Sequence, residues 1–284
     1  MRNVSTITKP KIDILSIILS TIGFGGIVYG FSAAGEGAGE WLQKGVLLPI
    51  VIGTISLTLF SIRQFKMEQP MINLRVFKFS MFTLGVIMVF AAMMLILASA
   101  ILLPLYLKGS LLLTAFTAGL VLLPGGLVNG LMSPFAGTLF DKYGPKFLVI
   151  PGFIMTTITT FFLSDITTTT STTIIIILHT CLFIGIALIM MPAQTNGLNQ
   201  LPPAFYPDGS AVMNTLSQIA GAIGTAVAVS IMAAGQENYN SNLKGMPNVE
   251  TMAEALTAGI QNAFLFALIA SIIGLVVSLF VKRV

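Results

Sequence analysis

Long apolar runs, each near the length that a helix needs to cross a bilayer, constrain this chain more than any other feature. A membrane-spanning helix requires ~20 mostly apolar residues to cross ~30 Å of hydrocarbon. We expect spans at Ile14–Ala34, Val46–Ile62, Phe82–Leu105, Ala115–Phe140, Phe147–Leu163, Thr173–Ala193, Gly209–Ala233 and Ala258–Val281. These runs are too long, and alternate too little, for strands of a β-barrel. The sequence predicts an all-α polytopic membrane protein with about eight transmembrane helices.

The scarcity of charged residues excludes an ordinary soluble domain. Only 8% of the residues are charged, whereas a soluble domain carries about 25%. The basic residues lie in short loops between apolar runs, which is typical of membrane topology, so we expect no nucleic-acid partner. Cys181 lies inside an apolar run and predicts neither a disulfide framework nor a metal site. We expect no catalytic set and no cofactor or metal site, and the polar start predicts no cleavable signal.

The loop charges predict the orientation of the chain. If the N-terminus is cytoplasmic, eleven basic residues lie inside: Arg2, Lys9, Lys11, Arg63, Lys66, Arg75, Lys78, Lys142, Lys146, Lys282 and Arg283. Only three lie outside, namely Lys44, Lys108 and Lys244. Because cytoplasmic loops carry the excess of Lys and Arg, we expect a multi-pass plasma-membrane protein with both termini in the cytoplasm and the lipid bilayer as its surroundings.

One connection divides the chain. Residues 65–79 contain Pro70 and apolar residues spaced among Arg75 and Lys78, which is typical of a cytoplasmic interfacial linker. It separates two transmembrane helices in residues 13–64 from six more in residues 80–284. Residues 1–12 are expected to form a cytoplasmic N-terminal segment.

Charged residues are absent from the interiors of the expected spans, whereas neutral polar residues enter them. Asp13 opens a helix at the interface, where an acidic residue suits the N-terminus. His179 is the single histidine of the sixth span, and we expect a buried hydrogen-bonding residue there in preference to a proton relay. The neutral set is Asn129, Gln194, Asn196, Asn214 and Gln218. These side chains either bond between helices or line a wet cavity, and the pattern leaves both open.

Methionines and glycines add two further expectations. Met190, with other Met residues and Phe90, could contribute to an adaptable apolar pocket, although packing is the more ordinary role. The small residues Gly221, Gly224 and Ala228, three and four apart, let another helix approach closely. Five glycines of the fourth span, at positions 119, 125, 126, 130 and 137, are expected to do the same, and Pro124 and Pro134 invite bends.

A charged hairpin between the fourth and fifth spans carries a resemblance. The loop GTLFDKYGPK, residues 137–146, resembles the G-x-L-x-D-[RK]-x-G-x-[RK] signature of the major facilitator superfamily. The segments 122–137, 70–77 and 209–224 resemble the fourteen-span drug:proton antiporters, in particular the lincomycin-resistance type. The matches cover essentially the whole chain, in the expected order. The resemblance implies the C-terminal six-helix half of such a transporter, preceded by two extra linker helices.

The resemblance implies alternating access and proton-coupled efflux of a small hydrophobic drug-like substrate. The family's coupling acids lie mainly in the N-terminal half, so we expect them to be absent from this chain. A separately encoded N-terminal half is then the expected partner. The alternative is a non-transporting membrane fragment from a truncated or split gene; a membrane-embedded enzyme would need a polar catalytic set.

The resemblance also gives the hairpin a role as a conformational switch. Its residues are Gly137, Asp141, Lys142, Gly144 and Lys146. Gly144 permits the turn, and Asp141 is expected to meet a helix N-terminus or a basic partner across the cytoplasmic face. The simpler interpretation, that the charges only set topology, is weighted equally. The candidate cavity-lining residues are Asn129, Met190, Gln194, Asn214 and Gln218.

Overall fold

The computed structural model describes residues 13–36, 41–67, 70–242 and 248–283. Eight long helices account for most of them: α1 Ile14–Glu36, α2 Lys44–Lys66, α3 Ser80–Leu105, α4 Ala115–Tyr143, α5 Lys146–Leu163, α6 Thr172–Asn199, α7 Tyr206–Ser241 and α8 Val249–Ser278. Short turns η1 Leu74–Lys78, η2 Tyr106–Ser110 and η3 Pro203–Phe205 lie between them. Within these ranges the structure contains no strand.

The all-helical prediction is confirmed, because all eight helices are long and apolar enough to cross a membrane. The helices differ from the expected spans mainly at their ends. α7 runs on to Ser241 instead of ending near Ala233, and α8 begins at Val249 instead of Ala258. Membrane hydropathy cannot detect such extensions, because a helix continues after it leaves the hydrocarbon. The predicted N-terminal segment 1–12 lies outside the described residues.

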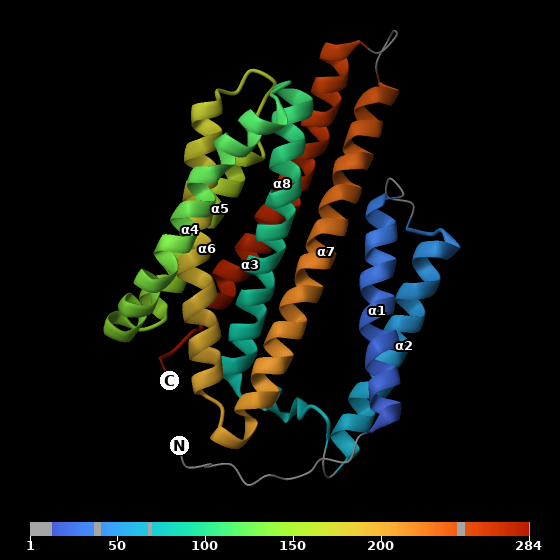
Figure 1. Cartoon of the computed structure of the whole chain (residues 1–284), viewed down its shortest axis with the longest axis vertical. Coiled ribbons are helices and arrows are strands. Elements are labelled where there is room, and N and C mark those ends of the chain that lie inside the picture. The colour runs from blue at the N-terminus through green and yellow to red at the C-terminus, as the bar shows by residue number, and fades with distance from the viewer. Residues whose placement is uncertain (1–12, 37–40, 68–69, 243–247, 284) are drawn as a thin grey trace.

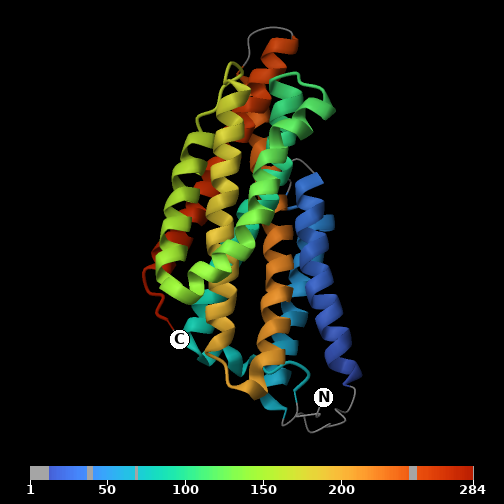
Figure 2. The same ribbon diagram turned by 60° about the vertical axis from the view of Figure 1, so that its left-hand side comes forward.

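The helices form one bundle with a helix pair at its side (Figure 1). α3 and α8 lie near the centre, α4, α5 and α6 lie on one side, and α1 and α2 lie beyond α7 on the other. Ser230 of α7 donates a hydrogen bond to the Ala34 carbonyl of α1 at 3.0 Å, which ties the pair to the bundle. α4 changes direction along its length (Figure 2), and it contains Pro124 and Pro134.

Glycines set the closest helix contacts. A Cβ on Gly85 of α3 would lie 2.7 Å from the Ala193 carbonyl oxygen of α6, and one on Gly185 would lie 2.8 Å from the Gly152 carbonyl oxygen of α5. Because lipid is as apolar as leucine, helices in a membrane associate through such close packing and through polar contacts. Ser271 of α8 supplies a polar contact, with its hydroxyl 2.9 Å from those of Thr156 and Thr157 on α5.

Side chains at one end of the bundle bind segments that are distant in sequence. The Gln200 side-chain oxygen accepts hydrogen bonds from the Met81 and Phe82 amides at 2.6 and 3.2 Å, which caps the start of α3. The Asp208 carboxylate accepts from the Asn73 amide at 3.1 Å, just before η1. The connection from α2 to α3 is thus held against the turn that joins α6 to α7.

An ion pair joins α1 to α2 at the same end. The Arg63 Nε and Nη2 groups donate to the two carboxylate oxygens of Asp13 at 3.0 and 3.1 Å. Asp13 also accepts from the Ser16 hydroxyl at 2.5 Å, as expected for a residue that opens a helix. Hydrogen bonds from Arg63 and Ser16 lower the pKa of Asp13 from 3.8 to about 2.

We expect this ion pair to stabilise the helix pair in a pH-dependent way. The pKa of Asp13 is lower in the folded chain than in the unfolded chain, so its contribution is complete above the unfolded value and is lost as pH falls towards 2. The difference in unfolding free energy between wild type and Asp13→Asn should be constant above about pH 5 and shrink between pH 4 and 2. Melts in detergent at each pH measure it. An unchanged difference across that range would contradict the assignment.

Candidate functional site

The hairpin between α4 and α5 has the geometry of a fixed turn. Gly144 ends α4 with a φ of 79°, a conformation that favours glycine, and its amide donates to the Phe140 carbonyl at 2.8 Å. Lys146 begins α5 directly afterwards. Arg283, near the C-terminus, donates from Nη2 to the Asp141 carbonyl at 2.9 Å, and its side chain lies against Gly144. The C-terminal segment therefore holds this turn.

The charged side chains of the hairpin are exposed. In the described ranges, the Asp141 carboxylate has no ion pair or hydrogen bond. The bond from Arg283 reaches the backbone carbonyl of Asp141 and leaves the carboxylate unpaired. Lys142 lies over the Tyr143 ring, 5.1 Å from its centroid. Gly137, one turn earlier, faces Met191 of α6. The carboxylate is therefore free to meet a cationic group from outside these segments.

The hairpin lies at the basic end of the bundle. The described basic residues at this end are Arg63, Lys66, Arg75, Lys78, Lys142, Lys146, Lys282 and Arg283. Lys44 and Lys108 lie at the opposite end. An excess of Lys and Arg at one end is the charge pattern of a cytoplasmic face.

Two candidate cavity residues share an exposed face of α7. Asn214 and Gln218 are one turn apart, and both are exposed. They lie roughly two and three turns from the start of α7, which places them inside the span. α7 therefore presents a polar face at membrane depth that the described helices do not cover.

The other three candidates lie on α4 and α6. The Asn129 side chain donates to the Phe183 carbonyl of α6 at 3.0 Å, which is a bond between helices. Met190 packs against both main groups of buried apolar residues, and Gln194 is partly buried one turn further along α6. The structure therefore brings Asn129 to α6, whereas Asn214 and Gln218 lie on α7. None of the five candidates lines the pocket between α1, α2, η1 and α7.

The predicted packing residues of α7 face α3. A Cβ on Gly224 would lie 2.7 Å from the Met94 Cα, and Gly221 lies against the Leu97 side chain. Ala228 is buried in the core. On α4 the expectation of close approach is wrong for three glycines, because a Cβ added at position 119, 126 or 130 would have no atom within 4 Å, whereas one at position 125 or 137 would.

His179 of α6 is buried against Gly125 of α4, where an added side chain would overlap the imidazole. Its ring centroid lies 4.6 Å from that of Phe183. The Nδ1 atom is buried without a hydrogen-bond partner in the described chain, so the hydrogen bond expected from the sequence is not found at this atom. The described residues contain no group of three or more residues that could hold a metal ion.

The sequence did not predict the long-range contacts that Arg283, Arg63 and Asn196 make at the basic end. The contact of Arg283 with the hairpin and the pair between Arg63 and Asp13 both join residues that are far apart in the chain. Asn196 of α6, assigned only to a general polar set, donates to the Lys282 carbonyl at 3.0 Å. The only sequence signal for such contacts was that all these residues fall at the same ends of their spans.

Comparison with known proteins agrees with these observations. Residues 14–225 match the Major Facilitator Superfamily. The whole chain is 66% identical to the lincomycin resistance protein LmrB of Bacillus subtilis and covers 59% of that protein. It is 61% identical to the LmrB of Listeria monocytogenes, again covering 59%, and 39% identical to the transporter YcnB of B. subtilis, covering 58%.

The chain thus spans less than two thirds of the length of these curated relatives, while the relatives match all of the chain. The family match covers most of the eight-helix bundle, including the hairpin and the polar face of α7. The family consists of membrane transporters, which excludes the enzyme alternative. This multi-pass membrane chain belongs to the major facilitator superfamily.

Proposed function

We propose that this chain forms the C-terminal six-helix half, with two preceding linker helices, of a fourteen-span drug-efflux transporter. α3–α8 correspond to the half-transporter, and α1 and α2 to the linker helices. The basic end is cytoplasmic, so both termini lie in the cytoplasm of a plasma-membrane protein. The substrate is a small hydrophobic drug-like molecule, and the mechanism is alternating access.

The exposed polar face of α7 carries this proposal. A neutral amide in hydrocarbon seeks a partner on another helix or a water-filled cavity. Asn214 and Gln218 are exposed, so no helix of the described chain covers them. A second six-helix bundle packed against this face would enclose a polar cavity and complete the binding site between the two halves.

The hairpin then acts at the cytoplasmic side of that cavity. The exposed Asp141 carboxylate pairs with a basic group or a helix N-terminus of the second bundle in one state, and separates from it in the other. The energy for export comes from proton coupling through acidic residues of the second bundle. The described spans support this division, because no acidic residue lies in the middle of any of them.

Co-expression tests the proposal. The chain would be expressed in a lincomycin-sensitive bacterium alone, with the N-terminal six-span part of B. subtilis LmrB, or with that part carrying a neutralised acid. We expect energised lincomycin export only from the unaltered pair. Export by this chain alone would contradict the need for a second bundle. Absence of export from a pair that is inserted and associated would favour the non-transporting fragment.

A further inference from the structure

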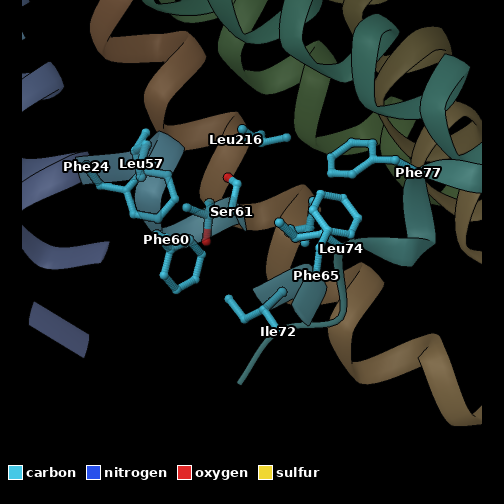
Figure 3. A pocket seen from close by; sticks show the side chains of 11 residues that line it. Phe24, Leu57, Phe60, Ser61, Phe65, Ile72, Leu74, Phe77 and Leu216 are labelled. Atoms are coloured by element: carbon cyan, nitrogen blue, oxygen red, sulfur yellow. The ribbon is translucent and has the colours of Figure 1, made fainter. Parts of the chain in front are cut away.

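We propose that the pocket between α1, α2, η1 and α7 binds one acyl chain of an anionic phospholipid, with the lipid headgroup held by Lys66, Arg75 and Lys78. The pocket has a volume of about 290 Å³, at the small end of the range for ligand sites. Figure 3 shows it from close by, with Phe24 and Leu57 at one side and Phe77 at the other. It is separate from the polar face of α7, and the proposal does not depend on transport.

The lining of the pocket suits a hydrocarbon chain. Nine of its eleven lining residues are apolar, and only the hydroxyls of Ser61 and Thr215 offer polar side-chain atoms. A polar ligand would leave its own groups without hydrogen bonds here, which is costly. Phe65 and Phe77 remain 51% and 37% exposed, so the pocket opens to its surroundings beside these two rings.

The depth of the pocket matches one bilayer leaflet. Its deepest lining residues lie nine or ten residues from the basic end on three helices: Phe24 on α1, Leu57 on α2 and Leu216 on α7. At 1.5 Å per residue, this is about 15 Å along each helix. Half of a ~30 Å hydrocarbon core has the same thickness. The pocket thus extends from the interface to roughly the depth at which an acyl chain ends.

Charge at the opening selects an anionic headgroup. Three lining residues are each followed directly by an exposed basic residue, namely Phe65 by Lys66, Leu74 by Arg75 and Phe77 by Lys78. The segment 63–78 contains four basic residues and one acidic residue. Basic residues near a cytoplasmic surface attract anionic lipids by ~1 kcal/mol each. The same charges disfavour a cationic drug as the occupant.

Native mass spectrometry of the full chain in mild detergent tests the site, with phosphatidylglycerol and phosphatidylcholine of identical acyl chains as probes. Leu216→Trp should fill the pocket, and the triple variant Lys66→Gln, Arg75→Gln, Lys78→Gln should remove the headgroup contacts. We expect each to weaken phosphatidylglycerol binding at least tenfold. In the triple variant each lost cation accounts for about fivefold, and in Leu216→Trp the indole occupies the space of the acyl chain. Wild type should prefer phosphatidylglycerol to phosphatidylcholine.

Two control variants separate this site from general lipid contact. Ile273→Trp adds the same bulk on the exposed surface of α8, and Lys142→Gln with Lys146→Gln removes charge from the hairpin. Both should bind phosphatidylglycerol as wild type does. Equal binding of the two lipids by wild type, or equal losses in the control variants, would overturn the proposal. A non-lipid adduct that is bound by wild type and lost in Leu216→Trp would also overturn the proposal.

Discussion

Replacing Gly224 with leucine should lower the free energy of unfolding of this chain by about 3 kcal/mol or more. A Cβ at this position would lie 2.7 Å from the Cα of Met94 on α3. A backbone atom cannot move aside as a flexible side chain does, so α3 and α7 would have to separate. Such overpacking typically costs 1–3 kcal/mol and occasionally more. Here it also forces apart two packed helices, α3 at the centre of the bundle and α7 beside it.

A leucine at Gly126 provides the matched control. This glycine lies within α4 and has no atom within 4 Å of an added Cβ. Because glycine is a poor helix former, the substitution should be neutral or stabilise the chain by up to about 1 kcal/mol. Thermal unfolding of both variants in the same detergent measures the contrast. Equal melting temperatures would show that the contact between α3 and α7 does not limit stability.

The second large effect is expected for Asp141→Asn in the complete transporter. The substitution keeps the shape of the side chain and removes the charge that we propose to meet the second bundle. It also leaves the Arg283 hydrogen bond intact, because that bond reaches the backbone carbonyl. Efflux should fall about tenfold, within the range by which a coupling contact shifts an equilibrium between states. Membrane insertion should be unchanged.

Lys142→Gln separates a switch from a topological signal. Lys142 is the neighbouring exposed charge, and its described contact is with the Tyr143 ring of the same hairpin. If Asp141 is the switch contact, Asp141→Asn should lose efflux while Lys142→Gln keeps it. If these charges only set topology, both variants should transport at the normal rate once they are inserted. Initial rates of drug efflux from cells with equal amounts of inserted protein measure the difference. Normal efflux by Asp141→Asn would exclude the switch role.

The sequence was sufficient to predict the membrane helices because the bilayer sets their length. An apolar run such as that of α3 has one stable arrangement in lipid, a helix that satisfies its own backbone. The charged hairpin was also predictable, since Gly144 and the following Lys146 mark an abrupt end of an apolar run. The ends of α7 and α8 were not predictable, because helices outside the hydrocarbon obey no such length rule.

The partners of individual residues could not be read from the sequence. Glycines 125 and 126 are neighbours in the same pattern, yet one faces His179 and the other faces open space. A small residue shows that another helix can approach but does not identify it. Arg283 likewise appeared only as a topological charge, because its contact with the hairpin depends on where α8 ends in space.

The hydrogen bonds by which Gln200 caps α3 also couple the movements of two segments that are distant in sequence. Together with the bond from the Asn73 amide to Asp208, they connect the entry to α3 with the turn between α6 and α7. A displacement of either segment therefore pulls on the other through these hydrogen bonds. The ion pair between Arg63 and Asp13 holds α1 to α2, and Ser230 of α7 connects that pair to the bundle through the Ala34 carbonyl.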